Sequence, residues 1–156
     1  MVTMAGKEIF IDTNVLIYLN NTQHPFHKDV LHTLTLMQDE GHRFIINDQI
    51  IKEFLVVKSN LLNLENRFDT SVLEADVDFI TESFIVLQNP ATILKRLIAL
   101  ISKYHLKGKV IHDAFIAAFC LESGINQILT VNVKDFAVFY DEGIEIVALT
   151  KAKENE

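Results

Sequence analysis

Residues 9–19 read IFIDTNVLIYL, and this stretch interrupts an apolar run with three polar side chains. Its first residues predict a short buried strand that ends at Asp12, and the residues from Val15 onward predict the start of a buried helix. An ionised carboxylate between two buried elements is unfavourable unless something compensates its charge. Asp12 therefore either caps the helix or lies beside a positive charge.

The rest of the chain alternates between strand and helix patterns. Further strands are expected at residues 43–48, 84–88, 127–131 and 144–149. Helices are expected at residues 26–41, 49–62, 70–82 and 113–123, the second with Asp48 as its N-cap and the last ending before Gly124. A further helix is expected from Asn89-Pro90 onward. Its apolar stripe would consist of Ile93, Leu94, Leu97, Ile98 and Ile101. This alternation predicts an α/β fold in which a parallel sheet carries helices on both faces.

The composition fits one compact domain over residues 1–156. Hydrophobic residues make up 49% of the chain, which excludes a disordered protein. No apolar run is long enough to span a bilayer, and the N-terminus lacks the apolar segment and cleavage site of a secretory signal. The single cysteine, Cys120, lies in the apolar stretch AFIAAFCLE and is expected to be a buried thiol. A cytoplasmic location is the resulting expectation.

The formal net charge of −7 disfavours binding to a polyanion such as nucleic acid. The charges are unevenly distributed, however. Residues 83–112 contain no acidic residue but five basic ones, Lys95, Arg96, Lys103, Lys107 and Lys109. One face of the protein can therefore be basic although the whole chain is acidic.

Polar side chains are predicted to gather at one edge of the sheet, because ligands of such sheets bind at the carboxyl ends of the strands. The residues concerned are Asp12 after the first strand, Glu53 on the helix after the second, Asp113 at the start of an apolar helix, and Asn132 and Asp135 after the fourth strand. Each has a structural explanation when it is considered alone. Helix caps, exposed helix edges, helix N-termini and turns all favour such residues.

Considered together, these carboxylates indicate a bound divalent cation. Carboxylates at one edge repel one another, and without a compensating charge some would be protonated at neutral pH. Mg²⁺ or Mn²⁺ relieves this repulsion and takes oxygen ligands. Zinc does not fit, because the chain has neither a cysteine pair nor histidines at metal-ligand spacing. A carboxylate-bound Mg²⁺ or Mn²⁺ ion is suited to phosphodiester hydrolysis.

The chain resembles the PIN-domain ribonucleases, and among them the VapC-type toxins of bacterial toxin–antitoxin pairs. The resemblance rests on FIDTNVLIYL at residues 10–19, INDQIIKEF at 46–54 and GKVIHDAFIAAFCLESGINQILTVNVKDF at 108–136. It implies a three-layer α/β/α sandwich around a parallel sheet of four to five strands. It also implies a homodimer, and a small antitoxin protein that covers the acidic site.

Carried over position by position, the resemblance makes Asp12, Glu53 and Asp113 the metal-binding acids. At the fourth position some family members have an acid where this chain has Asn132, and others use the aspartate that is Asp135 here. We expect Asp135 to be the fourth acid, acting through water, and Asn132 to hold the loop or contact the metal's ligand shell. Ligating carboxylates generally need support from neighbouring side chains. The resemblance assigns that role to four residues, Thr13, Asn14, Thr130 and Asn132.

The resulting hypothesis is a Mg²⁺- or Mn²⁺-dependent endoribonuclease that acts as the toxin of a toxin–antitoxin pair. Lys103, Lys107 and Lys109 precede Asp113 and are expected to guide the RNA backbone to the site. Two alternatives are a stand-alone RNA-processing nuclease and a module that binds RNA or protein without cutting. A haloacid-type phosphatase is disfavoured, because it requires a second aspartate where this chain has Asn14.

Overall fold

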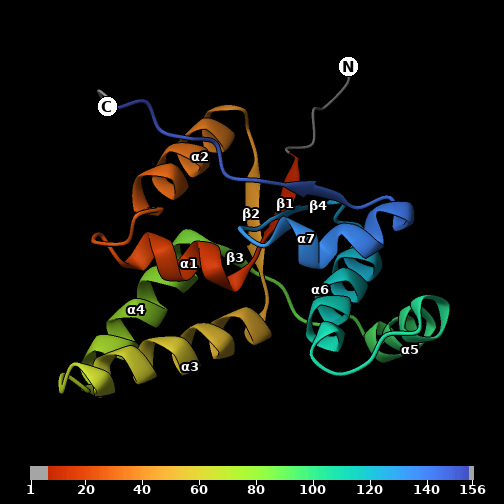
Figure 1. Ribbon diagram of the computed structural model, residues 1–156, viewed down its shortest axis with the longest axis horizontal. Helices are drawn as coiled ribbons and strands as arrows, with labels where there is room; N and C mark the ends of the chain where they lie inside the picture. Colours follow the sequence, from red (N-terminus) through yellow and green to blue (C-terminus); the bar gives the residue numbers. More distant parts are fainter. Residues whose placement is uncertain (1–6, 155–156) are drawn as a thin grey trace.

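In the computed structural model, which describes residues 7–154, five strands form one parallel sheet with helices on both sides (Figure 1). The strands are β1 (Glu8–Ile11), β2 (Arg43–Ile46), β3 (Ile85–Val86), β4 (Gln127–Leu129) and β5 (Glu145–Val147). Their order in the sheet is β3-β2-β1-β4-β5, and every neighbouring pair is parallel. The structure confirms the three-layer α/β/α sandwich that the sequence predicts.

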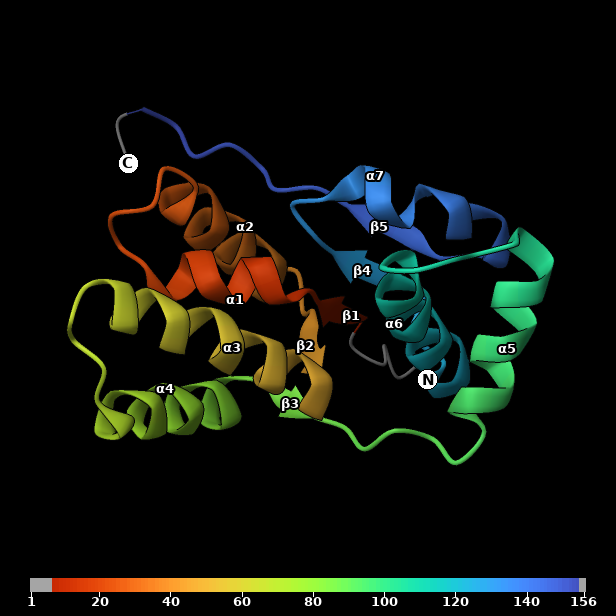
Figure 2. The same cartoon turned by 60° about the horizontal axis from the view of Figure 1, so that its bottom comes forward.

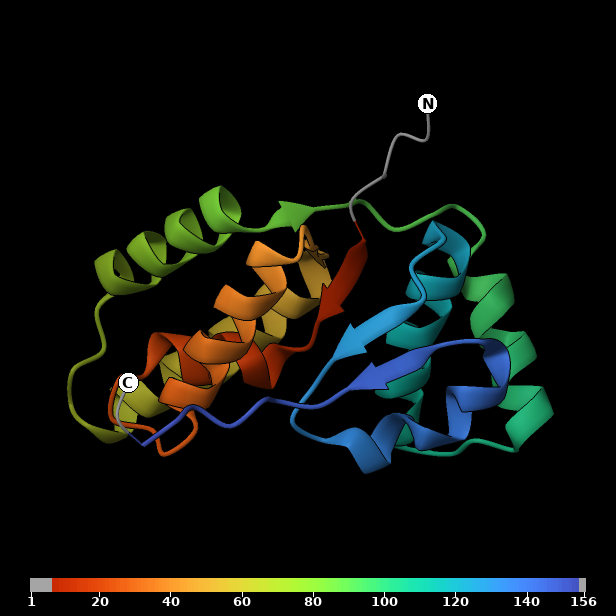
Figure 3. The same ribbon diagram turned by 90° about the horizontal axis from the view of Figure 1, so that it is seen from above.

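Helices connect consecutive strands. They are α1 (Thr13–Asn20), α2 (His27–Asp39), α3 (Asp48–Leu64), α4 (Thr70–Ser83), α5 (Ile93–Tyr104), α6 (Val110–Ser123), α7 (Val133–Phe136) and the 3-10 helix η1 (Ala137–Glu142). Crossovers between parallel strands are right-handed, and the chain reverses its direction across the sheet at β3. Helices α1 to α4 therefore lie on one side of the sheet and α5 to α7 on the other (Figure 2). The connection from β3 to α5 crosses between the two groups (Figure 3).

The central strand β1 explains the apolar half of the opening stretch. Phe10 pairs with Ile45 on β2 and with Ile128 on β4, and its ring centroid lies 5.3 Å from that of Phe119 on α6. These side chains are buried. Strands covered on both faces are nearly continuous apolar runs, and the last three residues of β1, Ile9, Phe10 and Ile11, form such a run.

Two helix starts differ from those expected. The N-cap of α3 is Asn47, whose side-chain oxygen accepts a hydrogen bond from the N–H of Ile50 at 3.2 Å. Asn47 has an extended backbone, which lets its side chain reach the free N–H groups of the first turn; Asp48 already belongs to the helix. Helix α6 begins at Val110, so Asp113 lies in its first turn and does not open it.

Helix α5 begins at Ile93, later than the start expected at residues 89–90, and it buries a different stripe from the one expected. The buried residues of this helix are Ile93, Leu97 and Leu100. Their spacing of four and three residues defines one helix face. Leu94 and Ile98 lie about 100° around the helix from that face, and both keep 64% of their surface exposed. For these two residues the expected stripe is wrong.

The short helices α7 and η1 lie at residues 133–142, where the sequence analysis predicts no element. Segments of this length are too short to produce a periodic apolar pattern. Cys120 is completely buried and unpaired, which confirms the expected thiol. Within residues 7–154, none of the helices is sufficiently long and apolar to cross a membrane.

Candidate functional site

Four of the polar residues expected at the sheet edge share one cavity. Asp12 follows β1 and is the N-cap of α1, Glu53 lies in the second turn of α3, and Asp113 lies in the first turn of α6. Asn132 follows β4 and precedes α7. All four line a cavity of about 400 Å³, together with Thr13, Asn14, Ile17, Val56 and Val57. Residues from four separate elements therefore meet at the carboxyl edge of the sheet.

Two hydrogen bonds hold the Asp12 carboxylate. Its Oδ1 accepts from the backbone N–H of Thr13 at 2.8 Å, and its Oδ2 accepts from the hydroxyl of Thr130 at 2.7 Å. Asp12 keeps 8% of its surface exposed, and Thr130 keeps none. The interpretation of Asp12 as a helix cap is correct, and the same carboxylate also lines the acidic cavity.

The loop after β4 depends on two of the expected supporting residues. The Thr130 hydroxyl accepts a hydrogen bond from the N–H of Asn132 at 3.0 Å, and the side-chain oxygen of Asn14 accepts one from the N–H of Val131 at 3.3 Å. Thr130 therefore holds the Asp12 carboxylate and the backbone of the loop at the same time. A loop fixed in this way keeps Asn132 at the cavity.

The Glu53 carboxylate is held by neutral donors on both oxygens. The hydroxyl of Thr13 donates to Oε2 at 2.7 Å, and the side-chain amide of Gln49 donates to Oε1 at 2.8 Å. Gln49 is not among the site residues that the sequence predicts. The signal was present, because residues four apart on a helix lie on the same face and can hydrogen-bond. These two donors orient the Glu53 carboxylate, but they carry no positive charge that would compensate its negative charge.

Within the described residues, no ion pair compensates the negative charge of the carboxylates at the site. Burial raises the pKa of Asp12; the hydrogen bonds from Thr130 and Thr13 oppose that rise, and the charges of Glu53 and Asp135 add to it. The site therefore holds several negative charges in one place and no basic side chain bound to them.

Burial and the crowding of negative charges also raise the pKa of Asp113. Its pKa is raised to about 6, first by burial and then by the charges of Asp135, Asp12 and Glu53, while His112 lowers it. A carboxyl group with such a pKa is partly protonated near neutral pH. A cation in the cavity would oppose this rise in the pKa of Asp113 and favour the ionised carboxylate.

Asp113→Asn is expected to stabilise the metal-free protein at about pH 7.5 by about 1 kcal/mol, after allowance for solvent screening. The folded protein binds the Asp113 proton more tightly than the unfolded chain, whose pKa is 3.8. Ionisation therefore lowers stability as pH rises from about 4 to about 6, and that cost is complete above pH 6. Urea unfolding in EDTA measures it. Below pH 4 the difference between variant and wild type should disappear; an equal difference at both pH values would contradict the explanation.

The donor set fits a hard divalent cation bound largely through water. In residues 7–154, no group of three or more His, Cys, Asp or Glu side chains is arranged to hold a metal ion, so water would have to supply most of the ligands. Mg²⁺ uses one or two carboxylates and keeps several water ligands, whereas structural zinc requires four close ligands. A cavity with uncompensated carboxylates on separate elements suits the first kind of ion and not the second.

The remaining predicted site residues are Asp135 and the three lysines, and none of them lines the cavity. Asp135 is exposed on α7 and does not line the cavity, but its charge raises the pKa of both Asp12 and Asp113. Lys107 and Lys109 are exposed on the connection that leads into α6. The ammonium of Lys103 lies 2.7 Å from Glu142, on η1.

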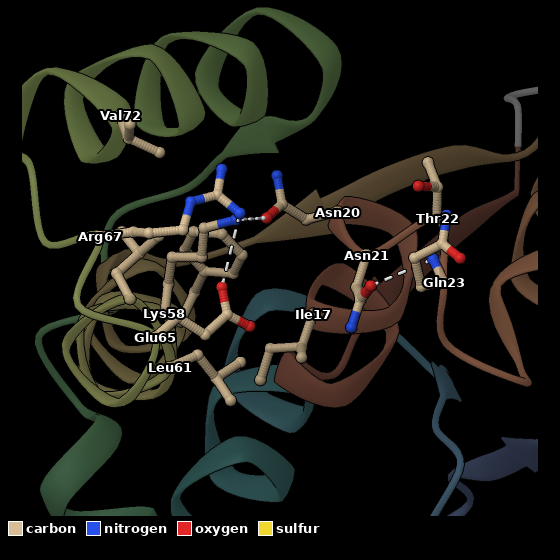
Figure 4. A pocket seen from close by; sticks show the side chains of 12 residues that line it. Ile17, Asn20, Asn21, Thr22, Gln23, Lys58, Leu61, Glu65, Arg67 and Val72 are labelled. Atoms are coloured by element: carbon tan, nitrogen blue, oxygen red, sulfur yellow. Dashed lines mark hydrogen bonds and ion pairs between the residues drawn. The ribbon is translucent and has the colours of Figure 1, made fainter.

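A second cavity, of about 470 Å³, lies along α1 and α3 and shares one lining residue with the site. Ile17 lines both cavities, and Figure 4 shows it beside the polar side chains of the second one. There Lys58 donates to Asn20 at 2.6 Å and lies 3.6 Å from Asp76, while Asn20 donates to Asp76 at 3.0 Å. This cluster joins α1, α3 and α4, and so helps to fix the two helices that carry Thr13 and Glu53.

Comparison with known proteins gives a match to one family model and to solved structures of similar fold. A family model described as the PIN domain matches residues 9–142. The chain is similar to a structure of VapBC2 from Rickettsia felis bound to a promoter DNA fragment, with a TM-score of 0.66, 14% identity, and coverage of 92% of this chain and 99% of that one. A structure of VapBC-1 from nontypeable Haemophilus influenzae gives 0.66 at 18% identity, with the same coverages.

A third similar structure is Mycobacterium tuberculosis VapC20, a Sarcin-Ricin loop cleaving toxin. Its TM-score is 0.56 at 16% identity, with coverage of 77% of this chain and 86% of that one. A search of curated protein sequences found no match.

Proposed function

The chain belongs to the PIN domain family, and from this premise we propose that it is a metal-dependent endoribonuclease. The observation that carries the proposal is the uncompensated charge of Asp12, Glu53 and Asp113 around one cavity. Carboxylates crowded in this way are unfavourable in the folded protein unless a cation joins them. Hydrolysis of RNA phosphodiester bonds is the chemistry that such a cation and this fold support best.

Asp12, Glu53 and Asp113 would hold the ion, which we propose to be Mg²⁺ or Mn²⁺. Asp135, outside the cavity, would act through water. Such an ion supplies a Lewis acid for phosphoryl oxygens and water of lowered pKa. The chain keeps the ligands ready: Thr130 and Thr13 fix the carboxylates of Asp12 and Glu53 before any ion arrives. Asp113 would give up its proton when the ion binds, since ligand carboxylates must be ionised.

The first test is cleavage of a mixed RNA panel by the wild-type protein with Mg²⁺, Mn²⁺ or EDTA. The panel should contain single-stranded RNA and structured RNA loops; VapC20 is described as cleaving the Sarcin-Ricin loop. Metal-dependent cutting is expected. Cutting that persists in EDTA would contradict the metal requirement.

We further propose that the enzyme is the toxin of a toxin–antitoxin pair, inhibited by a small antitoxin protein. The similar structures of VapBC2 and VapBC-1, and a toxin–antitoxin complex from Klebsiella pneumoniae, support this assignment. The site favours a partner with a basic side chain, which would compensate the acids as a cation does. The cavity beyond Ile17 gives such a partner additional room along α1 and α3.

Charge reversal of Lys107 and Lys109 to glutamate is expected to weaken RNA binding roughly tenfold and to reduce its salt dependence, because fewer phosphates are neutralised. Lys103→Glu is expected to have a smaller effect, since the Lys103 ammonium is already paired with Glu142. Binding of labelled RNA at several salt concentrations measures both. Equal losses at all three positions would show that the ion pair does not withhold Lys103 from RNA.

The broader proposal is a single nuclease domain over residues 1–156 that acts in the cytoplasm as a homodimer. The exposed apolar side chains of Leu94 and Ile98 on α5 are consistent with a dimer interface. Light scattering would determine the oligomeric state. A stand-alone RNA-processing nuclease remains the alternative enzyme, and a neighbouring reading frame for a small DNA-binding antitoxin would distinguish the two.

A further inference from the structure

A groove beside the acidic cavity has no assigned role in the proposed metal site. It encloses about 480 Å³ between the first turns of α3, the connection that follows β3, and helices α5 and α6. Figure 2 shows these segments around the start of α3. The groove opens at the carboxyl edge of the sheet, which is the edge where ligands of such folds bind.

The groove has one apolar side and a rim of polar groups. Leu97, Ile111 and Phe115 supply the apolar surface. Asp48 and Lys52 on the rim are exposed and form no hydrogen bond or ion pair with any other described side chain. An aromatic and apolar surface beside unpaired donors and acceptors is how proteins bind an unstacked nucleobase.

Gln49 connects the groove to the acidic cavity. It lines the groove, and its amide nitrogen donates to Glu53 in the cavity. Because a carboxylate can only accept, this bond fixes the orientation of the amide. The amide oxygen of Gln49 is buried and lacks a partner within the described chain. A buried carbonyl without a partner is unfavourable, so a hydrogen-bond donor on a ligand in the groove would satisfy it.

The groove and the cavity are close enough to serve one nucleotide. Gln49 and Glu53 are four residues apart on α3, about 6 Å along the helix axis. On α6, His112 lines the groove and the adjacent Asp113 lines the cavity. A phosphate at the acids would therefore place a neighbouring base at the groove.

We propose that this groove binds one nucleobase next to the cleaved phosphate and prefers a base with an exocyclic amino group, namely adenine, cytosine or guanine over uracil. The inference rests on the proposed ribonuclease function and adds a recognition element to it. The reason for the preference is the acceptor pair formed by Asp48 and Gln49, since acidic and amide side chains accept hydrogen bonds from base amino groups. Phe115 would provide the apolar contact with the base.

The test measures binding, so that it does not depend on cleavage. Full-length Asp113→Asn protein in EDTA is titrated into fluorescein-labelled oligouridine of about ten nucleotides, a length that suits single-strand binding grooves. Three further oligonucleotides carry one central adenosine, cytidine or guanosine. Fluorescence anisotropy is expected to show binding about tenfold tighter for at least one of these three than for oligouridine.

Asp48→Ala and Phe115→Leu are then introduced singly into the same protein. Asp48→Ala is expected to reduce the preference to about twofold or less, because it removes an acceptor. Phe115→Leu is expected to weaken binding of all four oligonucleotides, because it removes the aromatic ring on which any base can stack. The matched controls are Asp78→Ala and Phe79→Leu, exposed residues of the same types on α4, which should keep the preference. Asp48 is exposed, so its variant remains informative if replacement of Phe115 disturbs folding.

Equal affinity for the four oligonucleotides, or no binding to any of them, would overturn the inference. A preference that survives in Asp48→Ala would also overturn it. Failure of the proposed function gives a different result, namely no metal-dependent cleavage by the wild-type protein in the RNA panel. The two failures are therefore distinguishable.

Discussion

Asp12→Asn and Asp113→Asn are each expected to lower metal-dependent RNA cleavage by at least about 100-fold, because a catalytic ion contributes several kcal/mol of charge stabilisation. Each substitution keeps the side chain's shape and removes one negative charge from the cavity that both residues line. Asparagine at position 12 can still cap α1, so loss of activity would not reflect loss of the helix.

The measurement is single-turnover cleavage of the RNA that the wild-type protein cuts, with Mn²⁺ titrated in parallel by calorimetry. Asp78→Asn, an exposed acid on α4, is the matched control and should retain wild-type activity. Asp135→Asn and Asn132→Ala belong in the same series, because their relative loss of cleavage shows which of the two residues fills the fourth position of the proposed metal site. Full cleavage by both Asp12→Asn and Asp113→Asn would contradict the proposed nuclease centre.

Thr130→Val is expected to weaken metal binding by about 10- to 100-fold, the usual effect of removing a side chain that orients a ligand. The substitution removes the hydroxyl that donates to Asp12 at 2.7 Å and accepts from the N–H of Asn132 at 3.0 Å. Because the bond from Thr130 lowers the pKa of Asp12, its loss should raise that pKa further. Metal binding should then require a higher pH than in the wild type.

The pH dependence of Mn²⁺ affinity distinguishes this positioning role from a general loss of stability. Thr130→Ser keeps the hydroxyl and should restore most of the affinity, whereas valine matches threonine in shape without the hydrogen bonds. Thr35→Val is the matched control, since the Thr35 hydroxyl bonds only to its own helix at an exposed position. If serine and valine at position 130 weakened the affinity equally, the hydrogen bond would not be the cause.

Local pattern was enough to predict most elements of the fold. A short apolar stretch identified β1, and helical spacing identified α2, because burial of one face leaves a period in the sequence. The prediction was wrong where a neighbour decides which face is buried. On α5, packing buries Ile93, Leu97 and Leu100. Leu94 and Ile98 are exposed, although they too are spaced as residues on one helix face.

The sequence by itself also indicated that Asp12, Glu53 and Asp113 lie together, because ligands of parallel sheets bind at the carboxyl ends of the strands. Asp135, which was expected with them, does not line the cavity. Only the tertiary structure decided how the acids are held. Thr130 and Asp12 are 118 positions apart, and Thr13 and Glu53 are 40 apart. The pairing of Lys103 with Glu142 spans 39 positions. Hydrogen bonds and ion pairs of this kind require contact within about 3–4 Å, which depends on how separate elements pack and leaves no period in the sequence.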